Sequence, residues 1–209
     1  MRERKQGRIR CVQKSLCCTA RILKECAREL ALPITLLVRL MLCKGCWPRC
    51  WRVHWIIPIY KRNAVSDPSN YRGVHLTTLL SKVAERIINS LMTPFFQQTG
   101  AFGTPQFAFQ KGLSANDLVA YLICYWILCL NNREKIGIYL SDISGAFDKV
   151  EKFRLLQKLA DTGLNDNLRK LLQDYLSIRA AYILSNGKKS DQMDLENTIF
   201  QGTVLGPSL

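Results

Sequence analysis

Apolar side chains recur at every third or fourth residue along much of the chain, a spacing that predicts amphipathic helices. On this basis we expect helices over residues 16–32, 34–44, 78–98, 114–130, 151–162 and 165–178. Pro33 should separate the first two helices and Gly163 the last two, because both residue types interrupt a helix. Ser114 is a suitable N-cap for the fourth helix.

Other stretches alternate apolar and polar residues, or form short apolar runs between turns, and these predict strands. Residues 136–142 form one such run, and residues 179–185 and 193–200 should pair as a hairpin closed by Asn186-Gly187. The alternation over residues 51–60 places four apolar side chains on one face: Val53, Trp55, Ile57 and Ile59. Helices and strands in this order indicate an α+β fold.

The longest apolar run, Leu118 to Leu130, is shorter than the roughly 18–20 residues that span a bilayer. We therefore expect a buried helix there and no association with a membrane. The nine cysteines are an odd number, and no secretory leader precedes them. These features favour an intracellular chain with reduced thiols, in the nucleus or the cytoplasm.

The chain carries a formal net charge of +14. Residues 1–50 hold most of this excess, so they form a basic N-terminal segment. Such a charge suits a polyanionic partner such as nucleic acid, although a solvated basic tail explains the N-terminus equally well.

The strongest chemical signal is Asp142-Ile143-Ser144-Gly145-Ala146-Phe147-Asp148, at the end of a predicted strand. A carboxylate held by a rigid strand can bind a divalent metal ion. Phosphoryl transfer to a 3′ hydroxyl uses such carboxylates to hold two metal ions about 4 Å apart.

This segment resembles motif A of reverse transcriptases, in which an aspartate is followed by three residues, Ala, an aromatic residue and a second Asp. The resemblance implies that Asp142 binds the metal and that Ile143 contributes a backbone carbonyl to the site. Phe147 then falls at the steric gate that selects deoxynucleotides, and Asp148 matches the second acidic residue of the motif.

Three more segments follow the order of the same family. Residues 57–62 and 68–72 resemble the fingers of LINE-type enzymes, which implies that Lys61 and Arg72 bind the incoming triphosphate, with Arg62 as the alternative to either. A solvated basic loop is the alternative reading of these cations. Residues 106–114 resemble a segment along the template path, with Lys111 and Ser114 as template contacts, and Gln201-Gly202 resembles motif B beside the incoming nucleotide.

The resemblance thus points to the reverse transcriptase of a non-LTR (LINE-type) retrotransposon over roughly residues 20–209. It implies an α+β right-hand polymerase fold, C-terminally truncated, with a basic helical segment (1–50), fingers (51–135) and a partial palm (136–209). It also implies Mg²⁺, with Mn²⁺ as an alternative, and RNA template, DNA primer and deoxynucleoside triphosphates as partners. The aromatic-Ala-Asp-Asp segment of motif C is missing, so we expect exposed apolar surface and no polymerisation by this chain alone.

Two other classes of function stay open at this point. One is a non-catalytic nucleic-acid-binding remnant, and the other is a reverse transcriptase of the group II intron maturase type. The spacing of Cys43, Cys46, Cys50 and His54 is not that of a zinc knuckle, so we do not expect zinc. His75 has no evident partner, Cys124 and Cys129 are expected in the core, and the placement of Trp47, Trp51 and Trp55 favours packing over base stacking.

Overall fold

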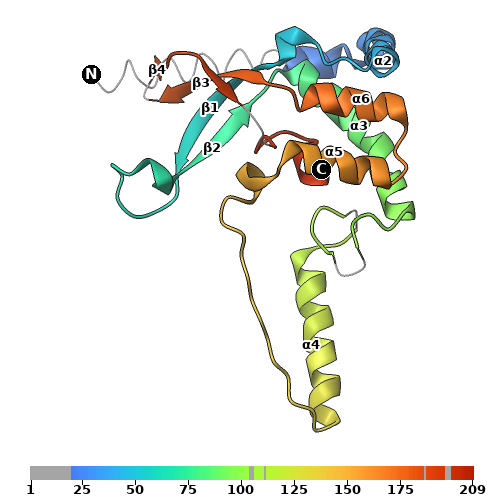
Figure 1. Cartoon of the computed structure of the whole chain (residues 1–209), viewed down its shortest axis with the longest axis vertical. Coiled ribbons are helices and arrows are strands. Elements are labelled where there is room, and N and C mark those ends of the chain that lie inside the picture. The colour runs from blue at the N-terminus through green and yellow to red at the C-terminus, as the bar shows by residue number, and fades with distance from the viewer. Residues whose placement is uncertain (1–19, 104–105, 111, 186, 196–198) are drawn as a thin grey trace.

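The computed structural model of the chain describes residues 20–103, 106–110, 112–185, 187–195 and 199–209, and it is a mixed α/β fold (Figure 1). Its helices are α2 (Ala27–Lys44), α3 (Leu79–Gln98), α4 (Ala115–Asn131), α5 (Lys152–Asp161) and α6 (Asp166–Tyr175). Its strands are β1 (Val53–Tyr60), β2 (Tyr71–Leu76), β3 (Arg179–Ser185), β4 (Lys188–Lys189) and β5 (Met193–Leu195). Short 3-10 turns are η1 (Arg49–Trp51), η2 (Pro68–Asn70), η3 (Ala146–Lys149) and η4 (Gly206–Ser208).

The sheet has the strand order β2-β1-β3-β4, with β5 also paired to β3. Strands β1 and β2 form an antiparallel hairpin, whereas β3 lies parallel to β1 although more than a hundred residues separate them in sequence. The predicted strand over residues 51–60 is confirmed as β1. The predicted hairpin is confirmed for β3 with β4 and β5, while Asn186 and residues 196–198 lie outside the described residues.

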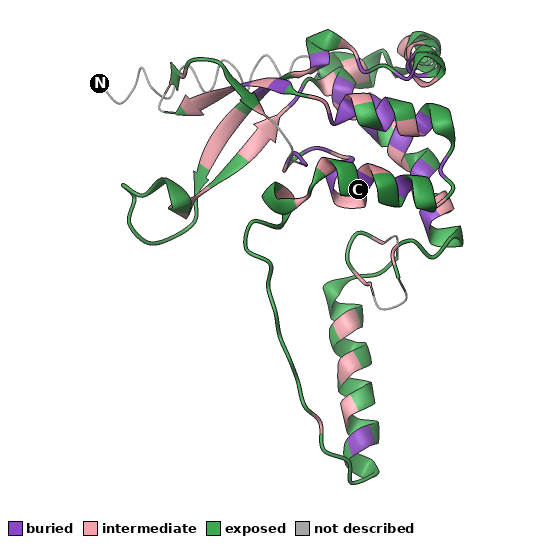
Figure 2. Ribbon diagram, in the orientation of Figure 1, coloured by how far each residue is buried: buried purple, intermediate pink, exposed green. Residues whose placement is uncertain are grey.

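The hydrophobic core lies where α2, α3, α5 and α6 meet, beside the sheet. Figure 2 shows the buried residues gathered on these helices, while β1 and β2 are half-buried or exposed along most of their length. Ile88 of α3 and Leu171 of α6 are fully buried, together with Trp47 from the turn after α2. Gly45 ends α2 in a left-handed conformation, and a Cβ there would lie 2.8 Å from Lys170 Cβ, so only glycine lets α2 and α6 approach this closely.

The predicted helix boundary at Pro33 is wrong. Residues 20–25 are helical, the chain turns at Cys26, and α2 then continues through Pro33 to Lys44. Residues 16–19 of the predicted first helix lie outside the described residues. Proline removes only its own donor to the carbonyl four residues earlier, and burial of Val38 and Met41 on the far side of Pro33 helps hold the helix together. The predicted helices over residues 78–98, 151–162 and 165–178 are confirmed as α3, α5 and α6.

The predicted strand over residues 136–142 is also wrong, because this segment has no regular secondary structure. Tyr139 and Leu140 are each 89% exposed, and none of the described strands pairs with the segment. A strand is stable only when another strand satisfies its backbone donors and acceptors, and an apolar run cannot show where that partner is.

Helix α4 confirms the predicted helix over residues 114–130 but not its predicted burial. Figure 1 shows α4 and the extended chain after it projecting away from the other helices. Tyr121, Tyr125 and Leu128 are exposed, and so is Cys124, which we expected in the core, whereas Cys129 is buried as expected. The apolar composition of this helix favours burial, but the sequence of the helix does not show which surface would cover it. In the described part of the chain, none of the helices is long and apolar enough to cross a membrane.

Candidate nucleotide-binding site

The first predicted site residue, Asp142, lies in the extended segment between α4 and η3 and is exposed, as is the neighbouring Ile143. The described residues contain no group of three or more His, Cys, Asp or Glu side chains arranged to hold a metal ion. Asp142 therefore lacks the strand support that its position in the sequence predicts.

Asp148 lies closer to the folded body, in η3. Gly145 begins this turn in the left-handed conformation, with φ of 66°, which suits glycine. Phe147 is half-buried and packs against the hydrophobic core, so its ring is fixed from one side. The negative charge of Asp148 favours the protonated form of His75 on β2.

The predicted triphosphate-binding cations lie on the β1–β2 hairpin and in its loop. Lys61 and Arg62 follow β1 directly, and Arg72 is paired with Ile59 across the hairpin. All three side chains are exposed.

The loop that carries these cations is well defined. The Lys61 N–H donates to the Asn70 carbonyl at 2.8 Å, and the Tyr71 hydroxyl donates to the Val65 carbonyl at 2.8 Å. The Asp67 carboxylate accepts from the Ser69 N–H at 2.9 Å and caps η2. These bonds hold the backbone under the cations while their side chains stay in solvent.

The Gln201-Gly202 turn lies against the free edge of β2. The His75 N–H donates to the Gln201 carbonyl at 3.0 Å. Gly202 has φ of 95°, and a Cβ there would lie 3.1 Å from the His75 carbonyl oxygen. Glycine is therefore required at this position both by its backbone conformation and by the close approach to β2.

A buried carboxylate on α3 holds the residues that follow this turn. Glu85 is fully buried, and one of its oxygens, Oε2, accepts from the Val204 N–H at 2.7 Å and from the Leu205 N–H at 3.4 Å. Its other oxygen accepts from the Ser81 hydroxyl at 3.1 Å. The turn is thus held from β2 on one side and from α3 on the other. Sequence reasoning missed Glu85, although it interrupts the apolar stripe of α3.

His75 was expected to have no partner, and that expectation is wrong. Its Nδ1 lies 3.1 Å from Nδ1 of His54, whose Nε2 lies 2.9 Å from Nη1 of Arg179. Arg179 can only donate, so His54 accepts at Nε2 and carries its proton on Nδ1. That proton is donated to His75, which then carries its own proton on Nε2. A continuous series of hydrogen bonds thus runs from Arg179 through His54 to His75.

The burial of this hydrogen-bonded network explains why the pKa values of both histidines are lowered. Burial lowers the pKa of His54 to about 3, with smaller contributions from the positive charge of Arg179 and from protonation of the neighbouring His75. Burial also lowers the pKa of His75, and the negative charge of Asp148 offsets part of that effect. Both imidazoles are therefore neutral at pH 7, as the chain of donors requires.

Phe200 stands where the family more often has proline, and its buried ring packs on this chain. The Phe200 ring centroid lies 4.7 Å from that of His54 and 4.7 Å from the guanidinium carbon of Arg179.

Cys43, Cys46 and Cys50 are exposed, whereas the His54 ring is hydrogen-bonded to Arg179 and His75. These four residues therefore do not share one site.

The predicted template segment, residues 106–114, leads into α4. Ser114 and Asp117 form a capping box, with the Ser114 hydroxyl donating to Asp117 at 2.6 Å, so Ser114 is used by the helix. Lys111 lies outside the described residues. Phe109 in this segment has a left-handed backbone conformation, with φ of 59°.

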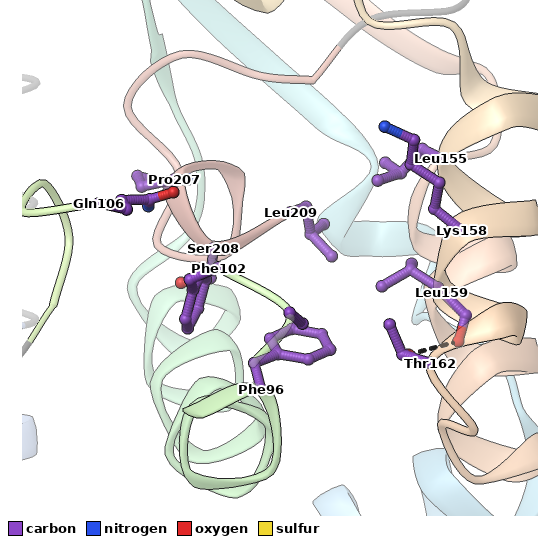
Figure 3. Close-up of a pocket in the computed structure, with 11 residues that line it drawn as sticks. Phe96, Phe102, Gln106, Leu155, Lys158, Leu159, Thr162, Pro207, Ser208 and Leu209 are labelled. Carbon is purple, nitrogen blue, oxygen red and sulfur yellow. Dashed lines mark hydrogen bonds between the residues drawn. The ribbon is translucent and has the colours of Figure 1, made fainter. Parts of the chain in front are cut away.

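A pocket of about 290 Å³ lies beside this segment, between α3, α5 and the last residues of the chain (Figure 3). Gln106 lines it, with Phe96 and Phe102 on one side and Leu155 and Leu159 on the other. Its lining contains none of the predicted catalytic or triphosphate-binding residues.

The structure therefore gathers part of the predicted site around β2. The Gln201-Gly202 turn lies next to His75, and the negative charge of Asp148 acts on the same imidazole. Arg72 is three residues earlier on the same strand, about 10 Å away at the usual rise of a strand, and this odd spacing turns its side chain to the opposite face of the sheet. Asp142 is six residues before Asp148, in the extended segment, and is exposed.

A mixed α/β fold with exposed cations on the β1–β2 hairpin and a close-packed glycine turn against β2 suits the polymerases that transfer nucleotides. The chain belongs to the reverse transcriptase (RNA-dependent DNA polymerase) family, whose sequence model matches residues 59–209. The resemblance that the motifs carry is thereby confirmed.

Individual relatives refine this assignment to retrotransposons. The chain is 28% identical over 193 residues to the RNA-directed DNA polymerase from mobile element jockey of Drosophila melanogaster, covering 91% of this chain and 20% of the relative. It is 27% identical over 188 residues to the probable RNA-directed DNA polymerase from transposon X-element of the same species, covering 90% and 21%. The chain thus spans about a fifth of the length of these relatives.

Proposed function

We propose that this chain is the fingers and the first part of the palm of an RNA-directed DNA polymerase of a non-LTR retrotransposon. The family match supports this proposal, and one observation of the structure carries it furthest. The Gln201-Gly202 turn lies against β2, where the His75 N–H donates to the Gln201 carbonyl. This contact between segments far apart in sequence supports the proposal.

In this proposal the cations of the hairpin bind the triphosphate of the incoming deoxynucleotide. Lys61, Arg62 and Arg72 are exposed and lie on a backbone fixed by hydrogen bonds, so they are available to phosphate oxygens. Phe147, fixed against the core, serves as the gate against the ribose 2′ hydroxyl. The Gln201-Gly202 turn lets the backbone approach the base pair that forms.

The carboxylates fit a single metal-binding position better than a site for two metal ions. Asp142 and Asp148 are the two candidates, and the 209 residues contain no adjacent pair of aspartates. Mg²⁺, or Mn²⁺ in its place, would activate the primer 3′ hydroxyl when bound. Because the described carboxylates do not form a complete site for two ions, we propose that this chain alone binds template and primer but does not extend the primer.

A second candidate function is nucleic-acid binding without catalysis. The net charge of +14 and the exposed, unsupported position of Asp142 favour it. The retrotransposon relatives favour the LINE type over the group II intron maturase type.

The test is a primer-extension assay on the purified chain, with poly(rA), a labelled oligo(dT) primer, dTTP and Mg²⁺, run beside a binding assay on the same hybrid. We expect binding that weakens as salt rises, and no extension. Extension that is lost in Asp142→Asn would keep the site assignment and overturn the expected inactivity. Extension that persists in Asp142→Asn would overturn the role of Asp142, and absence of binding at low salt would overturn the proposed function.

A further inference from the structure

The sheet has two faces of opposite character. Residues paired across neighbouring strands share a face. His54 of β1 and Ala181 of β3 are such a pair, and both are fully buried against the core. Trp55 and Tyr182 are the next pair, so they lie on the opposite face. We call this second face the outer sheet face, and the strand register places on it, among others, Val53, Trp55, Ile57, Ile59, Arg72, Tyr182 and Lys189.

The outer sheet face is apolar and yet open to solvent. Val53 and Trp55 are each 37% exposed and Ile59 is 52% exposed. The alternation of β1 predicts one apolar face correctly, but the structure turns that face outward and the His54 face inward. Exposed apolar surface on this scale, with charged residues at its rim, marks an interaction site.

An aromatic pair forms the centre of the face. The ring centroids of Trp55 and Tyr182 lie 5.6 Å apart, with 36° between the ring planes. Nζ of Lys189 lies 3.6 Å from the Tyr182 centroid and 5.3 Å from that of Trp55. The Tyr182 hydroxyl donates to Oε1 of Gln192 at 2.8 Å, which fixes the ring.

The charges around the pair set the chemistry of the partner. Lys189 lies beside the rings and Arg72 lies on the same face at β2, continuous with the hairpin that carries Lys61. Asp194 is on the same face but at its far end, paired with Ala180, which is itself the partner of Val53. Cations therefore lie on both sides of the aromatic pair, Lys189 on β4 at one edge of the sheet and Arg72 on β2 at the other.

We propose that the outer sheet face binds single-stranded nucleic acid, with bases stacked on Trp55 and Tyr182 and a phosphate bound by Lys189. Aromatic rings beside cations are the pattern that single strands require, because an unpaired base offers a flat surface and its phosphate a charge. A duplex keeps its bases stacked inside and cannot use the rings. An apolar protein segment would instead bury Lys189 and Arg72 without partners, which is costly. The choice of RNA as the strand, leading to the polymerase site as template, rests on the proposed function.

The test measures the binding of the full chain to a fluorescein-labelled, unstructured RNA 12-mer by anisotropy, with tryptophan fluorescence recorded in parallel. We expect Trp55→Ala and Tyr182→Ala each to weaken binding roughly tenfold or more, the effect of removing one stacked base. Trp55→Phe should retain most of the affinity, since a ring remains. Lys189→Gln should reduce the slope of log K against log salt by about 0.7.

Matched controls come from exposed residues away from the sheet. Tyr121→Ala on α4 removes an exposed aromatic ring, and Lys158→Gln on α5 removes an exposed cation. Both should bind like the unaltered chain, and circular dichroism and a thermal melt confirm that each variant is folded.

Equal affinity of the outer-face variants and the controls would overturn the proposal, as would equal affinity for the single strand and for the same RNA in a duplex. If Trp55→Ala unfolds, Lys189→Gln and Trp55→Phe still test the proposal. The proposal is overturned if Lys189→Gln leaves the salt slope unchanged and Trp55→Phe leaves the tryptophan quenching on RNA binding unchanged. Loss of RNA affinity in the outer-face variants supports the face whatever primer extension shows, so the two proposals fail separately.

Discussion

Glu85 provides the sharpest test of how the Gln201-Gly202 turn is held in place. Replacing it with alanine removes the acceptor of the Val204 and Leu205 N–H groups and of the Ser81 and Tyr175 hydroxyls. A buried donor left without a partner costs about 1–3 kcal/mol. The hydrogen bond from the Leu205 N–H is long, so its loss should contribute little. We therefore expect Glu85→Ala to lower the free energy of unfolding by about 2–5 kcal/mol, a large part of the ~5–15 kcal/mol of a typical domain.

The assay is urea unfolding followed by circular dichroism, combined with hydrogen exchange at individual amides. Glu85→Gln keeps an acceptor for the two amides, so we expect a smaller loss, about 1–2 kcal/mol. Glu25→Ala is the matched control, because Glu25 is exposed and only pairs with Arg21 on the same helical stretch, so its loss should stay within about 0.5 kcal/mol.

Hydrogen exchange separates this mechanism from a general loss of packing. The amides of Val204 and Leu205 should exchange faster in Glu85→Ala by more than the change in global stability requires, whereas amides of α6 should follow global stability. A free energy of unfolding equal to that of the Glu25→Ala control, or unchanged protection of both amides, would refute the reasoning.

Further predictions follow from the same region and from the exposed segments. In the folded chain the pKa of His54 is lowered from 6.5 to about 3, so between these pH values the unfolded chain binds more protons than the folded chain. The free energy of unfolding, measured by urea titration, should therefore fall by up to ~4–5 kcal/mol as the pH drops from about 6.5 to 3. His54→Gln should flatten this dependence of stability on pH. Gly202→Ala should destabilise by about 1–3 kcal/mol more than Gly163→Ala, since both have positive φ but only Gly202 has backbone within reach of a new Cβ. The double variant Tyr139→Ser/Leu140→Ser should lower self-association in sedimentation velocity while shifting the free energy of unfolding by less than about 0.5 kcal/mol, and unchanged association would show that other surfaces drive it.

Local patterns predicted the elements well wherever the chain meets its own partners. Helices α3, α5 and α6 follow their apolar spacing because each turns that spacing toward the shared core. The segment over residues 136–142 has an equally clear pattern and yet forms no strand. Its pattern states what the side chains prefer, whereas strand formation depends on a backbone partner that the pattern does not describe.

The site was predicted by motif order more than by physical pattern, and its supporting residues were missed. Glu85 left one signal in the sequence, since it occupies the apolar stripe of α3 with Ala84, Ile88 and Met92. A charged residue at such a position requires buried donors, but nothing local shows that they come from Val204 and Leu205, more than a hundred residues away.

The orientation of β1 links the buried network to the outer sheet face. Apolar burial alone would place Trp55 and Val53 inside and His54 outside. The fold does the reverse because Arg179 and His75 satisfy both ring nitrogens of His54, which removes the penalty for burying it. Because adjacent residues of a strand point to opposite faces, the burial of His54 places Trp55 on the solvent side, beside Tyr182 and Lys189. A replacement of His54 that breaks this network should therefore weaken both the position of the Gln201-Gly202 turn and RNA binding at the outer sheet face.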